Sequence, residues 1–272
     1  MHPTFFQLGS LHIPIFGVVA AIGLMAALAL CQRTARYASL DPTALWDAGL
    51  TGMIAAFVIS RLLLIVFNFH SFLTYPVLLM AVPSLTSTGI LLTAAFMVLY
   101  LRRKRLPLLA VLDASAPCAA LIWAFVNLGR IAEGTKDGMP STLPWAIAAG
   151  MPSPMPGSMP GSMYSAMHAG VHPVELYTVL VALALCALLF SLLRRRDYTG
   201  RTTALGLLTA GVAVFFLDFF RLPSDLFPDS HTAWLDPAQV LALGMILVGS
   251  VLVFRGPSKH QEADRIGAGN AF

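Results

Sequence analysis

Seven long apolar runs, separated by short polar or basic segments, restrict what this chain can fold into. A helix needs about 20 mainly apolar residues to cross the hydrocarbon core of a bilayer, and each run is close to that length. The composition agrees, because 57% of the residues are hydrophobic and 11% are charged, as in multi-spanning membrane proteins. We therefore expect an all-α, polytopic membrane protein with seven transmembrane helices. The predicted helices cover residues 12–32, 46–67, 83–101, 107–128, 173–193, 203–222 and 237–254.

Most basic residues fall on one side of these predicted spans. Thirteen of the 17 Lys and Arg follow the first, third, fifth and seventh spans. The positive-inside rule assigns that side to the cytoplasm, so we expect the N-terminus outside and the C-terminus in the cytoplasm. The net charge of +4 then reflects topology and anionic lipids, and we expect no nucleic-acid partner. The residues concerned are Arg33, Arg36, Arg102, Arg103, Lys104, Arg105, Arg194, Arg195, Arg196, Arg201, Arg255, Lys259 and Arg265.

The chain is expected to form one membrane domain, residues 1–256, and a disordered cytoplasmic tail, residues 257–272. Residues 139–171 differ from the rest because methionine recurs every fourth position from Met151 to Met167, among proline and glycine. Both of these residues disfavour helices, so this segment is predicted to be a flexible outer loop. Three interpretations of the loop stay open: a soft-metal site, since thioethers favour Cu(I), a mobile lid, or low-complexity drift.

Charged residues also interrupt the apolar runs on the side opposite the basic clusters. Arg61 lies about 21 Å along a helix from Asp47, which is expected at the cytoplasmic interface. An arginine at that depth is costly, so Arg61 is either a functional residue or one whose side chain extends outward to the lipid headgroups. Several of the predicted spans contribute such residues to the same outer region. They are Arg61, Arg130, Glu133, His172, Glu175, Asp218 and Arg221.

The outer arginines suggest a ligand class. Arginine binds phosphate through two parallel hydrogen bonds, so three arginines among carboxylates predict a phospholipid headgroup site. Arg130 and Glu133 are three residues apart and are close enough to pair on a helix. The fourth span also contains a carboxylate, Asp113, which we interpret as structural. The three cysteines have no paired spacing, and we interpret them as packing residues.

A set of short motifs extends from about residue 5 to residue 255. The motifs are Pro14-x-Phe16-Gly17, Arg61, Asp113-Ala-Ser-Ala-Pro117, Gly129-Arg130-Ile131 followed by Gly134 and Gly138, His172-Pro173-x-x-Leu176-Tyr177, and Asp218-Phe-Phe-Arg221-x-Pro223. In these motifs the chain resembles the prolipoprotein diacylglyceryl transferase family. Members of that family have seven spans. They transfer the diacylglyceryl group of phosphatidylglycerol to the cysteine thiol of a prolipoprotein lipobox at the outer face of the bacterial inner membrane.

The resemblance implies the same reaction here, with the same or an altered substrate, in the bacterial cell inner membrane and without a cofactor or a metal. The implied partners are phosphatidylglycerol and the signal-peptide region of a prolipoprotein. The candidate catalytic residues are Arg130, Glu133 and His172. The candidate substrate-binding residues are Arg61, Asn127, Gly134, Gly138, Glu175, Asp218 and Arg221.

The sequence departs from the family pattern at three functional positions, which hold Ser87, Thr135 and Val214. A catalytically inactive relative that binds phospholipid or lipoprotein at the outer leaflet is therefore an alternative. A third interpretation is a methionine-rich metal-binding or transport protein, for which paired methionines inside the spans would be expected. Activity toward a lipobox peptide distinguishes the first two.

Overall fold

The computed structural model describes residues 5–8, 11–67, 87–135, 137–148, 170–195, 198–222 and 236–255. Within them the chain forms seven helices and five short strands. The helices are α1 (Ile15–Tyr37), α2 (Pro42–Phe67), α4 (Ser87–Arg103), α5 (Leu108–Ala132), α7 (Val174–Arg194), α8 (Arg201–Asp218) and α9 (Pro237–Arg255). The strands are β1 (Phe5–Leu8), β2 (Leu11–Pro14), β3 (Pro140–Ser141), β4 (Ile147–Ala148) and β5 (Gly170–Val171). The predicted tail and most of the methionine-rich segment lie outside the described residues.

The helices confirm a polytopic, all-α membrane protein. Six of the seven described helices, all except α4, are long and apolar enough to cross a bilayer. Their ends lie within five residues of the predicted ends, because the apolar runs themselves determine where the helices can be buried in lipid. The α4 helix has 17 residues, and the first part of its predicted span, residues 83–86, is not described. The count of seven spans and their orientation stay predictions.

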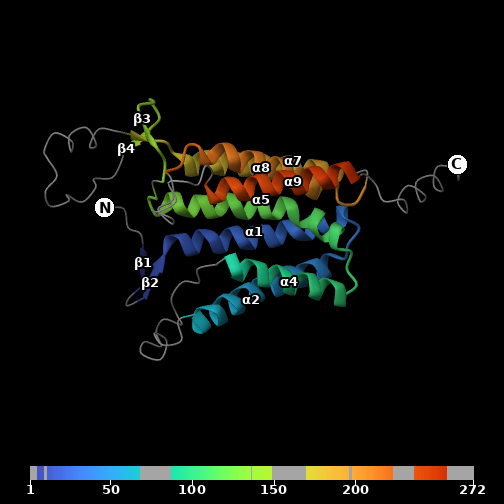
Figure 1. Cartoon of the computed structure of the whole chain (residues 1–272). Coiled ribbons are helices and arrows are strands. Elements are labelled where there is room, and N and C mark those ends of the chain that lie inside the picture. The colour runs from blue at the N-terminus through green and yellow to red at the C-terminus, as the bar shows by residue number, and fades with distance from the viewer. Residues whose placement is uncertain are drawn as a thin grey trace, which may run out of the picture.

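The α5 helix lies at the centre of the bundle, between α1 and α7, and α8 packs against α9 beyond α7. The α2 and α4 helices form a pair that meets the bundle mainly through α1. Figure 1 shows α2 diverging from α1 toward the end of the molecule that carries the strands, with α4 crossing it at an angle. The bundle therefore has a densely packed part around α5 and a more open part formed by α2 and α4.

Glycine and aromatic residues bring α1 and α5 into close contact. A Cβ atom on Gly23 would lie 2.2 Å from the Phe125 side chain, and one on Gly129 would lie 2.9 Å from the ring of Phe16. Each helix thus offers a glycine to an aromatic ring of the other. Such close approach is how helices gain packing energy in a bilayer, where lipid tails compete for apolar contacts. The packing fixes the last turns of α5 against the start of α1.

Charge is segregated between the two ends of the described bundle. Arg36 lies in the last turn of α1, and Arg103 and Arg194 lie in the last turns of α4 and α7. Arg201 is the first residue of α8. These helix ends lie opposite the end that carries the strands (Figure 1). The arrangement agrees with the predicted clustering of basic residues on one side.

Asp113 is structural, as predicted. Its side chain is fully buried in α5. It accepts hydrogen bonds from the backbone N–H of Gly200 (2.6 Å), the backbone N–H of Thr203 (2.8 Å) and the Thr203 hydroxyl (2.7 Å). A carboxylate at a helix N-terminus satisfies backbone N–H groups that have no partner within the helix. Asp113 therefore caps α8 from a different helix.

The short strands correct the prediction of one long flexible loop. Residues Pro140–Ser141 and Ile147–Ala148 both pair with Gly170–Val171, which is the central strand of a small antiparallel sheet. The two ends of the predicted loop 139–171 are thus ordered, and only its middle lies outside the described part of the chain. A second hairpin, β1 with β2, precedes α1. Strands this short have no sequence periodicity that could predict them.

Replacing Asp113 with alanine is expected to lower the free energy of unfolding by about 3 kcal/mol, because it leaves three buried donors without an acceptor. Asp41→Ala is the matched control. Asp41 also accepts hydrogen bonds at a helix start, from the N–H and hydroxyl of Thr43, but it is exposed and water can replace it. Thermal unfolding in detergent should show the larger loss for Asp113→Ala, and equal losses would contradict the capping role.

Candidate functional site

The predicted site residues lie at the end of the bundle that carries the short strands. Successive described helices alternate in direction, so the C-terminal ends of α2, α5 and α8 and the N-terminal end of α7 all point toward this end of the molecule (Figure 1). Arg130 is in the last turn of α5, Asp218 is the last residue of α8, and Arg61 is six residues before the end of α2. His172 and Glu175 flank the start of α7. The structure places these residues at one end of the bundle, and their outer location and their roles stay predictions.

The α5 helix ends in a Schellman motif that depends on Gly134. The N–H of Gly134 donates to the carbonyl of Ile131 (2.9 Å), and the N–H of Thr135 donates to the carbonyl of Arg130 (3.0 Å). Gly134 has a φ of 77°, in the left-handed region that favours glycine. Arg130 is thereby held in the last helical turn, where the negative end of the helix dipole favours a cation.

Gly138 joins three segments that are far apart in the sequence. It forms an antiparallel bridge with Arg221, and two backbone hydrogen bonds of 2.8 Å link residues 137–139 to residues 220–222. On its other side, a Cβ atom would lie 2.0 Å from the carbonyl oxygen of His172. Only glycine fits in this position. We call this contact of three segments the Gly138 junction.

Aromatic rings surround His172. Its ring centroid lies 5.2 Å from that of Phe220 and 6.3 Å from that of Tyr177. The Tyr177 hydroxyl in turn accepts a hydrogen bond of 2.7 Å from the indole N–H of Trp145. The Nδ1 atom of His172 is buried and has no hydrogen-bond partner among the described residues. The imidazole is thus held in place with one nitrogen available to a ligand.

Other buried polar atoms at this end also have no hydrogen-bond partner in the described part of the chain. They are Nε and Nη1 of Arg61, Oε1 of Glu175 and Nε of Arg221. Each such atom costs about 1–3 kcal/mol if it stays unsatisfied. Unsatisfied polar atoms in a native structure therefore indicate where a polar ligand or water binds. The Arg221 guanidinium lies in the same junction as His172, and such a cation suits a ligand that carries phosphate.

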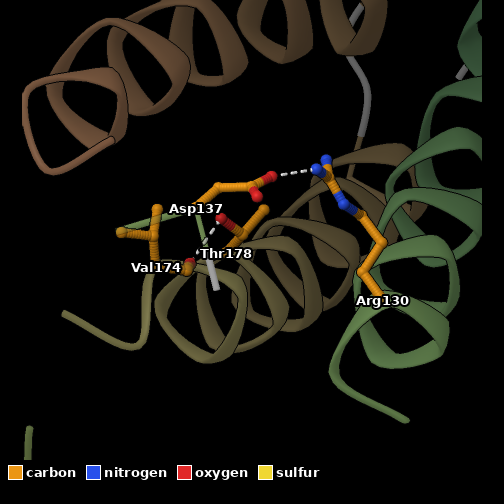
Figure 2. Close-up of polar contacts among 4 residues, drawn as sticks. All are labelled: Arg130, Asp137, Val174 and Thr178. Atoms are coloured by element: carbon orange, nitrogen blue, oxygen red, sulfur yellow. Dashed lines mark hydrogen bonds and ion pairs between the residues drawn. The ribbon is translucent and has the colours of Figure 1, made fainter. Parts of the chain in front are cut away.

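Arg130 forms an ion pair with Asp137, which the sequence analysis did not single out (Figure 2). Glu133 was the expected partner because it lies one helical turn from Arg130. The helix ends at Ala132, however, and the chain turns back so that Asp137 reaches the guanidinium. A signal was present in the sequence, since Asp137 is the last acid of the charged stretch that ends at Gly138.

The structure does not draw every candidate into the Gly138 junction. Asn127 is buried in α5, and its amide nitrogen donates to the carbonyl of Trp123 (2.8 Å). Arg61 lies on α2, which contacts mainly α1 and α4, and its guanidinium lies 5.2 Å from the ring of Phe57 on the same helix. In the described structure, Gly134 allows the chain to turn at the end of α5, and Gly138 allows two backbone segments to come into contact. Substrate binding by these residues stays a prediction.

The structure also bears on the metal alternative. In the described ranges, no group of three or more His, Cys, Asp or Glu side chains could hold a metal ion. The segment from Met151 to Met167, on which that alternative was based, lies outside those ranges. Cys31 and Cys118 are free thiols with their sulfur atoms 3.0 Å apart in the packed contact between α1 and α5. They are packing residues, as predicted.

Asparagine substitutions at the two glycines should have different effects. Gly138→Asn is expected to destabilise the protein by about 2 kcal/mol because its side chain collides with the His172 carbonyl. Gly134→Asn is the matched control, since asparagine tolerates a positive φ and a Cβ atom there meets nothing within 4 Å. Its loss should stay below about 1 kcal/mol. Thermal unfolding in detergent measures both, and a reversed order would show that the Gly138 junction is not tightly packed.

Curated relatives of the chain share one description. A protein from Clostridium tetani is 24% identical over 256 residues, which cover 93% of this chain and 97% of the relative. A protein from Methylococcus capsulatus is 28% identical over 263 residues, which cover 92% and 94%. A protein from Synechococcus elongatus is 29% identical over 149 residues, and there the chain spans about half of the relative, 51%. Each of the three is described as a phosphatidylglycerol–prolipoprotein diacylglyceryl transferase.

The model of one protein family matches nearly the whole chain. It covers residues 3–255, and its description is prolipoprotein diacylglyceryl transferase. The match includes all seven described helices and every segment of the Gly138 junction. On this match, the chain belongs to the prolipoprotein diacylglyceryl transferase family.

Proposed function

We propose that this chain transfers the diacylglyceryl group of phosphatidylglycerol to the cysteine thiol of a prolipoprotein lipobox. The observation that carries the proposal is the Gly138 junction, which places Arg221 beside His172. Each of these two residues has a buried nitrogen without a partner among the described residues. One can bind an anion, and the other can accept or donate a proton.

In this proposal the arginines bind the phosphate of the donor lipid. Arg221 and Arg130 are brought together by the segment from residue 137 to residue 139, since Asp137 contacts Arg130 and Gly138 pairs with Arg221. Guanidinium groups neutralise the charge that develops on a departing phosphate. Arg61 would contribute a third cation from the α2 side of the same end of the bundle. Asn127, Glu175 and Asp218 complete the proposed substrate-binding set, with Gly134 and Gly138 shaping its backbone.

The reaction requires a thiolate. The sulfur attacks the glyceryl carbon that bears the phosphate ester, so that an S–C bond forms as the C–O bond breaks and glycerol phosphate leaves. The thiol proton must pass to a base, because the thiolate is the nucleophile. His172 is the proposed base, with Glu133 as the other local candidate. His172 would serve this role in a chain that has Ser87 where the family has a histidine.

An apolar cavity supports binding of the lipid tails. It has a volume of about 310 Å³ and lies between α5, α7 and α8. Ala116, Ala120 and Trp123 line it from α5. Asn127 and Arg130 follow Trp123 at intervals of four and three residues, so they continue the same face of the helix. A phosphate at Arg130 would therefore have its acyl chains directed along this face toward the cavity.

We further propose the orientation and location of the protein. The Gly138 junction faces outward, with the N-terminus outside, and the basic end faces the cytoplasm, as the positive-inside rule requires. The chain crosses the bacterial inner membrane seven times as one domain, residues 1–256, with residues 257–272 as a cytoplasmic tail. The acceptor is the signal-peptide region of a prolipoprotein, which reaches the site from the outer face.

The test is transfer to a lipobox peptide with one cysteine, using purified protein in detergent that contains phosphatidylglycerol. Mass spectrometry should show a diacylglyceryl shift on the cysteine. His172→Ala is expected to lower the rate about 10²- to 10⁴-fold, as for loss of a general base. Arg221→Ala should lower it about 10²-fold or more, as for loss of a group that stabilises developing charge.

Arg36→Ala provides the control, because Arg36 is exposed at the opposite end of the bundle. It should leave the rate unchanged. If the wild-type protein produces no shift while an active transferase does so in parallel, the proposed reaction is excluded. Retained binding of phosphatidylglycerol would then favour the alternative of an inactive relative that binds lipid.

A further inference from the structure

The ion pair between Arg130 and Asp137 is a feature that the proposed reaction does not yet use. Figure 2 shows the Asp137 carboxylate pointing toward the Arg130 guanidinium from beside the first turn of α7, where Val174 and Thr178 lie. Because Gly138, the next residue, lies against the backbone of His172, the pair connects the end of α5 to the segment that precedes α7. A carboxylate is favoured near the positive end of a helix dipole, and a cation near the negative end.

The backbone on both sides of Asp137 is fixed. Gly134 reverses the chain at the end of α5 with its positive φ. The carbonyl of Asp137 accepts a hydrogen bond of 2.8 Å from the N–H of Leu222. The next residue, Gly138, is in contact with the backbone of His172. The position of the Asp137 side chain thus follows from the same contacts that assemble the candidate site.

Stability does not account for the pair. The side chains of Arg130 and Asp137 are 33% and 37% exposed, and ion pairs with this much access to water contribute little to folding. Nevertheless, Gly134, Gly138 and the bridge between Gly138 and Arg221 together bring Asp137 to this place. A role in the site explains this better than a role in the fold.

The contact leaves most of the guanidinium available. Nη2 of Arg130 donates to one oxygen, Oδ2, of Asp137. Guanidinium has five N–H donors in a rigid plane, so the donors on Nε and Nη1 can still bind another anion. An arginine side chain is otherwise free to adopt many rotamers, and fixing it in advance reduces the entropy lost on binding.

We propose that Asp137 is a positioning residue, which holds Arg130 so that its remaining donors face the phosphate of the donor lipid. The inference rests on the proposed function for the identity of that lipid. The alternative is that Asp137 competes with the lipid for Arg130. In that case Asp137 would occupy the place of the phosphate, and its removal would strengthen lipid binding. The two ideas predict opposite signs for one measurement.

The experiment measures binding of phosphatidylglycerol to the full-length protein in detergent by native mass spectrometry, together with transfer to the lipobox peptide. Asp137→Ala should weaken lipid binding about tenfold, as for one lost charge-assisted contact, and lower the transfer rate about 10- to 100-fold. Asp137→Asn should retain most of both, because its amide oxygen can still accept from Nη2 of Arg130. The unfolding temperature should stay near the wild-type value in both variants.

Two further variants separate positioning from a general structural effect. Adding Asp137→Ala to Arg130→Ala should cause no additional loss of lipid binding, because residues that act through one contact are not additive. Asp47→Ala is the control for removal of a carboxylate, since Asp47 is exposed near the start of α2 at the basic end. It should bind lipid and transfer it like the wild-type protein.

The outcomes distinguish this inference from the proposed function. Unchanged or tighter lipid binding by Asp137→Ala would overturn the positioning role, even if the wild-type protein is an active transferase. A wild-type protein that binds the lipid in an Asp137-dependent way but transfers nothing would support the positioning role and exclude the reaction. A wild-type protein that does not bind phosphatidylglycerol would overturn the inference directly.

Discussion

The contact between Gly138 and the carbonyl of His172 is the constraint on which the candidate site depends. It allows the segment after α5 to lie against the start of α7, while the opposite edge of that segment pairs with the residues after α8. The segment after α5, the start of α7 and the end of α8 are thereby joined through backbone atoms. The same backbone contacts fix the positions of His172 and Arg221 and bring Asp137 to Arg130.

Two buried polar residues show how differently a membrane helix can accommodate charge. Asp113 is fully buried, and it accepts three hydrogen bonds from the start of α8. Arg61 has two buried guanidinium nitrogens without a partner among the described residues. Leaving polar groups unsatisfied in a bilayer is costly. The hydrogen bonds of Asp113 account for its burial in the fold, whereas no described contact satisfies these two nitrogens of Arg61.

Much of the fold could be predicted because it depends on local composition. Apolar runs of about 20 residues determine the helices, and the basic clusters indicate which helix ends lie together. The ion pair of Arg130 could not be predicted in the same way, because it depends on a reversal at Gly134 and on pairing with residues more than 80 positions away. Helical spacing favoured Glu133 as the partner of Arg130, whereas the structure pairs Arg130 with Asp137.

The candidate site was found from its charges but not from its geometry. Arginine and histidine residues that occur near one membrane surface are visible in the sequence, whereas the aromatic contacts that fix His172 involve Phe220 and Tyr177 from different segments. The strands β3, β4 and β5, which pair near these segments, are each two residues long and therefore have no periodic pattern in the sequence. Family motifs supplied the connection between the segments, and the structure supplies the contacts.

The cap on α8 has a consequence for how the protein is made. Asp113 precedes Gly200 by 87 residues, and chains are synthesised from the N-terminus. The acceptor is therefore already in the membrane when the donors of α8 leave the ribosome. Until then the Asp113 carboxylate has none of these three partners, and the contact between α5 and the start of α8 is completed only after α7 has been made. A chain that ends before residue 200 would lack all three of these donors.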